Sequence, residues 1–394
     1  MPDLKDPIVI VAARRTPIGD FLGGLSPAPA PQLSAAATRA CLDDCGLDPA
    51  DIDEVLLGCV LPAGIGQAPA RQAALAAGVP EQVPCTTVNK VCGSGMKTLM
   101  LGHDAIVADH ARVVLCGGME SMSNAPYLLT RARTGYRMGH AEMLDHMFFD
   151  GLQNPYDGNM MGYFAEETAA KYAFTREQQD AFAIASVERA RAAIENGAFA
   201  AEVTPVRVKS RKAEVEIAQD EGPMRQDVAK IPQLKPAFRE NGTVTAASSS
   251  SISDGAASLV IMRQSEAERR GLPVLARIVG QAGAAQEPAW FTTAPVRAMR
   301  VLLERTGWSV DAVDLFEVNE AFACVAMAAM HDLGIEHAKL NVNGGACALG
   351  HPIGASGARI VVTLVHALRA RGGGRGVASL CIGGGEATAV AMEV

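Results

Sequence analysis

The sequence has few aromatic residues, no excess of positive charge and no cysteine pairs at metal-binding spacing. Aromatic side chains make up 5% of the 394 residues, and the formal net charge is −8, which argues against a nucleic-acid-binding surface. The nine cysteines include no C-x-x-C pair, so neither a zinc site nor a disulfide framework is expected. No apolar run reaches the length of a membrane span, and the first strand-like run, at residue 8, leaves no room for a signal peptide. We therefore expect a cytoplasmic protein with no metal and no membrane contact.

The second part of the sequence repeats the first. Residues 92–121 resemble residues 354–387, and residues 46–58 resemble residues 307–319 in the same order. Strand-like apolar runs alternate with helical periods in each part, which predicts parallel strands joined by helical crossovers. With 49% apolar and 20% charged residues, the chain can fill several cores. The predicted fold class is α/β, built from two similar units.

The repeat also defines the segment boundaries. We expect a first half at residues 1–121, an inserted domain at 122–247 that has no partner in the second half, completion of the first half at 248–272, and a second half at 273–394. The insertion contains one clear helical period at 175–197. Because a long excursion from a compact unit is usually functional, we expect it to bind substrate.

Cys92 lies on a glycine-rich turn between a strand-like run at 83–91 and a helical period at 96–110. A thiol close to a helix N-terminus is favoured as a thiolate, so we expect its pKa to lie below the free value. The alternative is a cysteine that only packs under a helix, because cysteine is among the most buried residue types.

Three further segments carry reactive or polar groups on similar turns. His351 lies in the glycine-rich loop 350–357, which opens a helix in the second unit as Cys92 does in the first. A twofold-like arrangement of the units would bring these loops together, and a cysteine beside a histidine is an activated thiol. Cys381 ends a strand before three glycines, where the alternative is a buried cysteine. Asn319 and Glu320 follow an apolar run, at the strand end where α/β sheets bind ligands.

The motifs VCGSG, NEAFA, GHPIGASG and CIGGG, in this order, resemble the thiolase family. The resemblance covers essentially the whole chain and implies a five-layer αβαβα fold with an inserted loop domain. The segments 150–162 and 243–257 are similar to those of acetyl-CoA acetyltransferases and 3-ketoacyl-CoA thiolases. Coenzyme A thioesters (acetyl-CoA, 3-ketoacyl-CoA) and free coenzyme A would be the substrates, with no cofactor, in fatty acid metabolism. The family also implies a homotetramer, a dimer of dimers, and that insertion residues make oligomer contacts.

The resemblance implies a role for each motif residue. Cys92 would be the acylated nucleophile and His351 its base, while Cys381 would move the substrate α-proton. Asn319 would hold a water that, with His351, binds one thioester oxyanion, and the amides of Cys92 and Gly383 would form a second oxyanion hole. The residues expected to contact coenzyme A are Leu152, Met161, Arg225 and Ser250.

Two other functions share this fold. Decarboxylating ketoacyl synthases resemble a Cys/His/His or Cys/His/Asn pattern, whereas Cys381 occupies the third position here. Acyl-CoA or lipid binders without activity tend to lose the NEAF motif, which this chain keeps. Many short-chain thiolases have histidine where this chain has Met160, so acyl chain length stays open. The sequence also leaves open whether the enzyme synthesises or degrades, and whether it is a dimer or a tetramer.

Overall fold

The two halves of the chain fold into similar series of strands and helices. The computed structural model describes residues 5–209 and 213–394. The main elements of the first half are β1 (Ile8–Arg15), α1 (Ala30–Cys45), β3 (Glu54–Gly58), α2 (Pro69–Ala76), β4 (Cys85–Val88), α3 (Ser94–Val107), β5 (Val113–Ser121), β10 (Ser253–Arg263) and α7 (Gln264–Arg270). Those of the second half are β11 (Ala276–Ala285), α8 (Ala294–Thr306), β12 (Leu315–Val318), α9 (Ala323–Leu333), α10 (Ala346–Leu349), α11 (Ile353–Ala370), β13 (Arg375–Ile382) and β14 (Glu386–Glu393).

Strand order confirms the internal repeat. The first half runs β1-β10-β5-β3-β4 and the second runs β11-β14-β13-β12. In each half the first three strands of that order pair antiparallel, and the next pair, β5 with β3 or β13 with β12, is parallel. The matching helices α1 and α8 both end at a glycine in the left-handed conformation, Gly46 and Gly307, where a side chain would strain the backbone.

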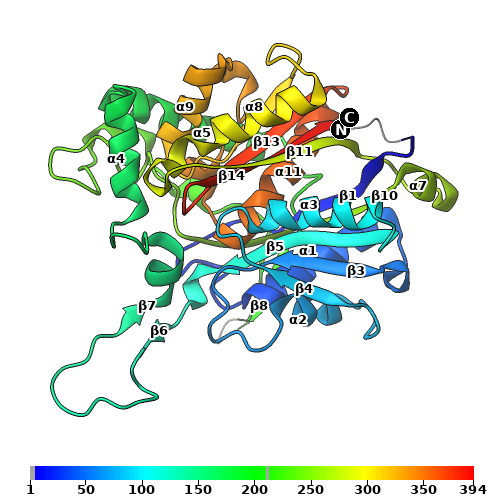
Figure 1. Cartoon of the computed structure of the whole chain (residues 1–394), viewed down its shortest axis with the longest axis horizontal. Helices are drawn as coiled ribbons and strands as arrows, with labels where there is room; N and C mark the ends of the chain where they lie inside the picture. Colours follow the sequence, from blue (N-terminus) through cyan, green and yellow to red (C-terminus); the bar gives the residue numbers. More distant parts are fainter. Residues whose placement is uncertain (1–4, 210–212) are drawn as a thin grey trace.

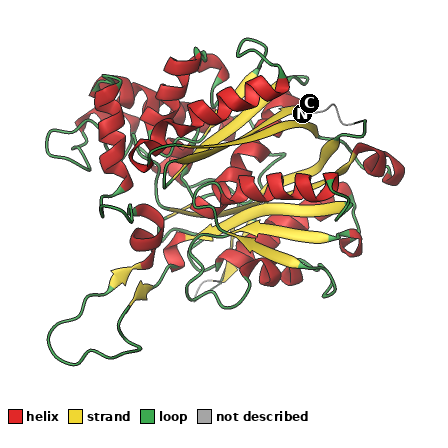
Figure 2. Ribbon diagram, in the orientation of Figure 1, coloured by secondary structure: helices red, strands yellow, loops and turns green. Residues whose placement is uncertain are grey.

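The halves stack as five layers. Helices α1 and α2 cover the first sheet, α3 and α11 lie between the two sheets, and α8 lies on the outer face of the second sheet, with α9 packed against it (Figures 1 and 2). The sheets join where β1 meets β11, with Val9 opposite Arg277 and Ile10 opposite Ala276. This arrangement confirms the α/β, five-layer fold predicted from the sequence.

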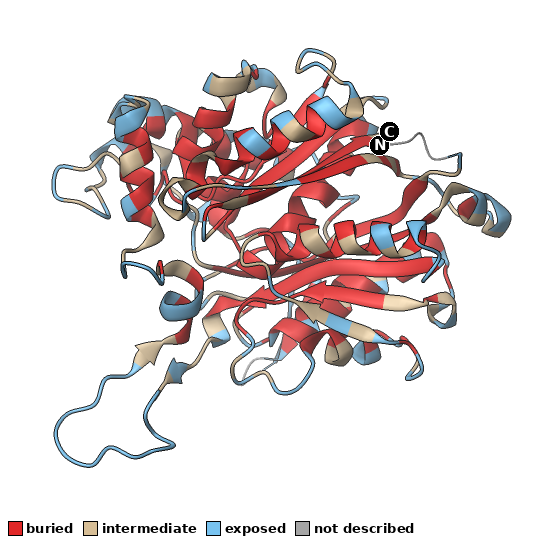
Figure 3. Cartoon of the chain, viewed as in Figure 1, coloured by how far each residue is buried: buried red, intermediate tan, exposed pale blue. Residues whose placement is uncertain are grey.

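The central strands and the helix α11 between the sheets are deeply buried. All nine residues of β5 are buried, as expected for a strand covered on both faces, and they include the polar side chains of Glu120 and Ser121 at its end. Among the described residues, α11 is the one helix long and apolar enough by composition to cross a membrane, yet 83% of it is buried inside the fold. Figure 3 shows the buried central strands and helices, so α11 is a core helix.

The insertion leaves the first half after β5 and returns at β10. Its elements are β6 (Tyr127–Leu128), β7 (Leu144–Asp145), a π-helix at Met147–Leu152, α4 (Met161–Lys171), α5 (Arg176–Glu195), β8 (Val206–Lys209), β9 (Glu214–Ile217) and α6 (Gly222–Arg225). The predicted helix at 175–197 is α5, which begins at a capping box between Thr175 and Gln178. Helices α4 and α5 pack on α9 of the second half. The residues between β6 and β7 form an arm that projects from the body (Figure 1).

Candidate active site

Cys92 lies on a strained turn directly before α3. Val91 has a positive φ of 45°, which is rare for a β-branched residue and costs about 1–3 kcal/mol. Neighbouring groups hold this conformation: the Asn89 Oδ1 accepts from the Val91 N–H at 2.9 Å, and the Ser94 Oγ donates to the Val91 carbonyl at 2.6 Å. Strain that is held in this way clusters at functional sites. It directs the Cys92 side chain toward a cavity rather than into the core.

The thiol of Cys92 is neutral in this setting. Burial raises the pKa of Cys92 to about 11, although hydrogen bonds from the backbone N–H groups of Gly383 and of Cys92 itself act to lower it. The nearby carboxylate of Glu120 also raises this pKa. The sequence-based expectation of a lowered pKa is therefore wrong, because desolvation outweighs the helix N-terminus and the backbone donors.

His351 lies in the loop between α10 and α11 with one ring nitrogen held and the other free. Its Nδ1 is 2.6 Å from the Ser356 Oγ, which in turn donates to the Pro352 carbonyl at 3.0 Å. The hydroxyl proton of Ser356 is donated to the Pro352 carbonyl, so the Ser356 oxygen can only accept from His351. Nδ1 therefore carries the imidazole proton, and the lone pair lies on Nε2. Nε2 is buried and has no hydrogen-bond partner within the described part of the chain. Burial, followed by the charge of Arg359, lowers the pKa of His351 to about 3, so the imidazole is a neutral proton acceptor.

Two glycines let the helices that carry these residues approach closely. A Cβ atom on Gly357 of α11 would lie 2.4 Å from the Met96 backbone nitrogen, and one on Gly95 of α3 would lie 2.8 Å from the Ala358 backbone nitrogen. Both distances are shorter than real side chains tolerate. The repeat thus brings the N-termini of α3 and α11 together, and with them Cys92 and His351.

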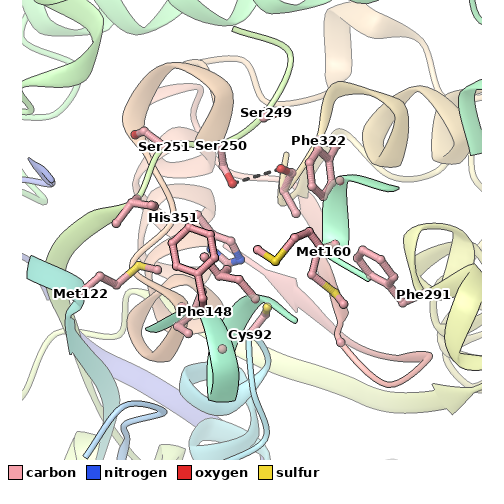
Figure 4. Close-up of a pocket in the computed structure, with 18 of the residues that line it drawn as sticks. Cys92, Met122, Phe148, Met160, Ser249, Ser250, Ser251, Phe291, Phe322 and His351 are labelled. Atoms are coloured by element: carbon pink, nitrogen blue, oxygen red, sulfur yellow. Dashed lines mark hydrogen bonds between the residues drawn. The ribbon is translucent and has the colours of Figure 1, made fainter. Parts of the chain in front are cut away.

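Cys92 and His351 open onto one apolar cavity of about 210 Å³. Figure 4 shows both side chains facing into it, with Phe148, Met160 and Phe322 around them. The other large apolar side chains in its wall are Met122, Leu152, Met161, Ile252, Phe238, Phe291 and Ile353. An apolar pocket that holds a few convergent polar groups is the usual form of a small-molecule site.

One of the remaining predicted catalytic residues lines this cavity, and the other two are buried near its catalytic groups. Gly383, in the turn between β13 and β14, lines it. Cys381 at the end of β13 is fully buried, and burial, followed by the field of Cys92, raises its pKa well above the ordinary value. Asn319, after β12, is also fully buried, with its Nδ2 3.4 Å from the His351 Nδ1. The structure therefore brings all five predicted residues together, with two of them behind the cavity wall.

The carboxylate of the NEAF motif is structural. Glu320 accepts hydrogen bonds from the Ser186 Oγ at 2.7 Å, the Asn341 Nδ2 at 2.8 Å and the Cys347 backbone N–H at 3.0 Å. It thereby ties α5 of the insertion and the segment before His351 to the end of β12. Glu320 positions the loops of the site and does not face the cavity.

The four residues expected to contact coenzyme A divide between two adjoining cavities. Leu152, Met161 and Ser250 line the inner cavity. Arg225 lines an outer cavity of about 720 Å³ and forms ion pairs with Asp20 and Glu221 at 3.0 and 2.9 Å. The two cavities share wall residues at 249, 251 and 252, so they adjoin along this segment.

Sequence reasoning missed three residues that support the site. Glu120 in β5 is fully buried and accepts the backbone N–H groups of Val60, Leu61 and Gly354 at 2.9–3.1 Å, which fixes the start of α11. Ser356 orients His351, and Arg359 lies beside Asn319. A carboxylate in a buried strand and an arginine in an apolar helix are the sequence signals that could have identified Glu120 and Arg359.

Comparison with known proteins agrees with this geometry. The family "Thiolase, N-terminal domain" matches residues 8–265 and "Thiolase, C-terminal domain" matches residues 272–394. The chain is 51% identical to an acetyl-CoA acetyltransferase of Pseudomonas aeruginosa over 98% of each chain, and 50% identical to acetyl-CoA acetyltransferase 2 of Arabidopsis thaliana over 98% of this chain and 97% of that one.

Solved structures show the same likeness. An acetyl-CoA acetyltransferase from Bacillus anthracis superposes with a TM-score of 0.96 at 41% identity, covering 98% of each chain. A thiolase from Ascaris suum in complex with coenzyme A superposes with a TM-score of 0.93 at 41% identity, covering 98% of this chain and 99% of that one. With both family domains matched in order across the same fold, the chain belongs to the thiolase family.

Proposed function

We propose that the protein is an acetyl-CoA C-acetyltransferase. It would catalyse the reversible Claisen condensation of two acyl-CoA thioesters, and in reverse the thiolysis of 3-ketoacyl-CoA. The observation that carries this proposal is the meeting of Cys92 and His351 from the two repeats on one apolar cavity. The names of relatives at about half identity support it.

In the first half-reaction Cys92 takes the acyl group. The neutral thiol transfers its proton to the free Nε2 of His351 as the sulfur attacks the thioester carbonyl, and coenzyme A leaves as the thiol after it receives that proton. Because both partners are neutral at rest, charge develops only during the attack. The N–H groups of Cys92 and Gly383, which already point at the sulfur, are suited to hold the developing oxyanion.

In the second half-reaction a carbon nucleophile attacks the acyl-enzyme. Cys381 gives its own proton to the neutral His351 and, as a thiolate, removes an α-proton from a second acetyl-CoA. The resulting carbanion bonds to the acyl carbon, and the Cys92 sulfur departs and takes the proton back from His351. His351 and a water held by Asn319 would stabilise the enolate oxygen. The contact between Asn319 and His351 and the electrostatic effect of Cys92 on Cys381 support this assignment, because groups that share one reaction step must lie close together.

Coenzyme A would extend across the two adjoining cavities. The pantetheine arm fits the narrow apolar part beside Leu152, Met161 and Ser250, and the phosphates would lie near Arg225 in the outer cavity. Arg225 already pairs with Asp20 and Glu221, so phosphates would compete with these carboxylates for it.

A 3-ketoacyl-CoA thiolase with longer substrates is the second candidate. Met160 lines the inner cavity together with several phenylalanines. A flexible thioether adapts to irregular apolar groups, so the cavity favours acyl chains beyond acetoacetyl. Initial thiolysis rates on a ladder of 3-ketoacyl-CoA esters separate the two candidates.

We further propose a homotetramer held in part by the arm between β6 and β7. Leu129, Met138 and Met143 on this arm are exposed, and Met138 is 96% accessible. A concentration of exposed apolar side chains on a projecting segment is typical of a protein interface. Light scattering on the wild-type protein and on Met138→Glu tests this, because loss of a tetramer to dimers would support the arm contact. The cytoplasmic location, the absence of a cofactor and a role in fatty acid metabolism stay predictions.

The activity is tested by acetoacetyl-CoA thiolysis with free coenzyme A. Wild-type protein is expected to produce acetyl-CoA with ping-pong kinetics, and Cys92→Ala is expected to produce none. Sequential kinetics, or turnover that survives in Cys92→Ala, would contradict the proposed acyl-enzyme.

A further inference from the structure

Arg359 is an arginine in the interior of the middle layer. It lies in α11, and its side chain is 2% exposed. The guanidinium donates to the Glu317 Oε2 at 3.4 Å and to the Asn319 Oδ1 at 3.5 Å. Its Nε has no hydrogen-bond partner among the described residues. A buried guanidinium with long contacts costs stability when compared with an apolar side chain, so its position calls for a functional reason.

The contact with Asn319 decides which way the amide of that residue points. Arg359 can only donate hydrogen bonds, so the atom that faces it must be the carbonyl oxygen of the amide. The Nδ2 of Asn319 then faces His351, at 3.4 Å from Nδ1. Because Nδ1 carries the proton that Ser356 accepts, this contact joins two donors and is not a hydrogen bond, so the orientation of the amide depends on Arg359. Without a donor in this place, the amide would be free to turn by half a revolution and present an acceptor to His351 instead.

The charge of Arg359 acts on His351 as well. Burial lowers the pKa of His351 first, and Arg359 lowers it further, since a positive neighbour disfavours the imidazolium. Other titratable groups surround the same region on the elements that pack against the loop. They include Cys92 before α3, Glu120 in β5, Glu317 in β12 and Glu320 after β12. Arg15 in β1 and Glu202 of the insertion also act on the charge of Arg359.

Resting on the function proposed above, we propose that Arg359 is a positioning residue for catalysis: it holds the Asn319 amide with Nδ2 toward His351, and its charge keeps the imidazole ready to accept a proton. Arg359 touches neither cavity, so it acts only through these two side chains. Glu317 anchors the guanidinium from the other side, and the two side chains are equally buried.

The two parts of this role are separable by substitution. Lysine keeps the positive charge but lacks the planar fork that reaches Glu317 and Asn319 together. Methionine keeps much of the length and removes both charge and donors. Glu317→Gln is the matched control, because it changes the same buried contact and leaves the charge of Arg359 and its contact with Asn319 in place.

The test is the pH dependence of kcat and KM for acetoacetyl-CoA thiolysis in R359M, R359K and E317Q. In R359M, kcat is expected to fall by up to about 10²-fold, with KM for coenzyme A within about twofold of wild type. The acid limb of the kcat profile is expected to move to higher pH by on the order of one unit. In R359K the acid limb is expected to stay at the wild-type pH while kcat falls. In E317Q both the acid limb and kcat are expected to stay at their wild-type values.

Two results would overturn the proposal. One is an equal loss of kcat in R359M at every pH, which would indicate a purely structural role. The other is a limb in E317Q that moves as far as in R359M. If R359M does not fold, the double variant R359M/E317Q removes the unpaired carboxylate and is read by the same criteria. Wild-type thiolysis and labelling of Cys92 test the proposed function separately, so failure of one idea is distinguishable from failure of the other.

Discussion

Replacing Gly357 by alanine tests whether the close approach of α3 and α11 is what assembles the site. The new Cβ would lie 2.4 Å from the Met96 backbone nitrogen. Neither backbone can yield by rotating a side chain, so α11 must move away by about 1 Å to reach an ordinary contact, at a cost of about 1–3 kcal/mol. His351 lies two residues before the start of this helix and would move with it. A displacement of about 1 Å between reacting groups can reduce turnover by about 10²-fold.

Two quantities are measured for each variant: the rate of acylation by acetyl-CoA and the melting temperature. Gly357→Ala is expected to lose roughly two orders of magnitude in acylation rate while it stays folded at assay temperature. Gly283→Ala in β11 is the matched control, because its Cβ would meet the Ala387 carbonyl oxygen at an ordinary 3.7 Å. Normal acylation in a destabilised Gly357→Ala would refute the reasoning, since it would mean that the distance between the helices does not set the geometry of Cys92 and His351.

Three further predictions follow from the site. Cys381→Ser is expected to form the acyl-enzyme normally but to lose about 10²–10⁴-fold in turnover. Radiolabelled acylation and α-proton exchange measure the two steps, and a loss of acylation in step with turnover would contradict the role of Cys381 as the base. Met160→His is expected to narrow the range of acyl chains that the enzyme accepts. If the wild-type thiolysis rate collapses between four- and six-carbon 3-ketoacyl-CoA, Met160 does not extend that range. Because burial raises the pKa of Cys92 to about 11, iodoacetamide alkylation of the free enzyme is expected to rise steadily from pH 7 to 10, and a plateau across this range would instead indicate a thiolate–imidazolium pair.

The repeat and the glycine-rich turns made the fold and the core of the site predictable from sequence. Segments that align between the halves had to form equivalent elements, so the turns of Cys92 and His351 had to occupy equivalent positions. The structure places both on one cavity, with each turn directly ahead of a middle-layer helix.

Electrostatics was not predictable in the same way. The sequence predicted a helix N-terminus beside Cys92, which is present, but it could not show how much solvent the surrounding segments exclude. That exclusion raises the pKa of Cys92 instead of lowering it. The role of Glu320 could not be predicted either, because its three hydrogen-bond partners come from segments far apart in the sequence. Arg359 stands out in the sequence as an arginine in an apolar helix, but only the fold shows that it lies beside Asn319.

The central claim is that Cys92 carries the acyl group between the two half-reactions. Peptide mass spectrometry after brief incubation with acetyl-CoA and acid quenching tests it most directly. We expect an acetyl group on the wild-type peptide that contains Cys92, and no acetyl group on the corresponding peptide of Cys92→Ala. An acetyl group found on Cys381 or Cys116 instead, or no covalent adduct in an enzyme that turns over, would contradict it.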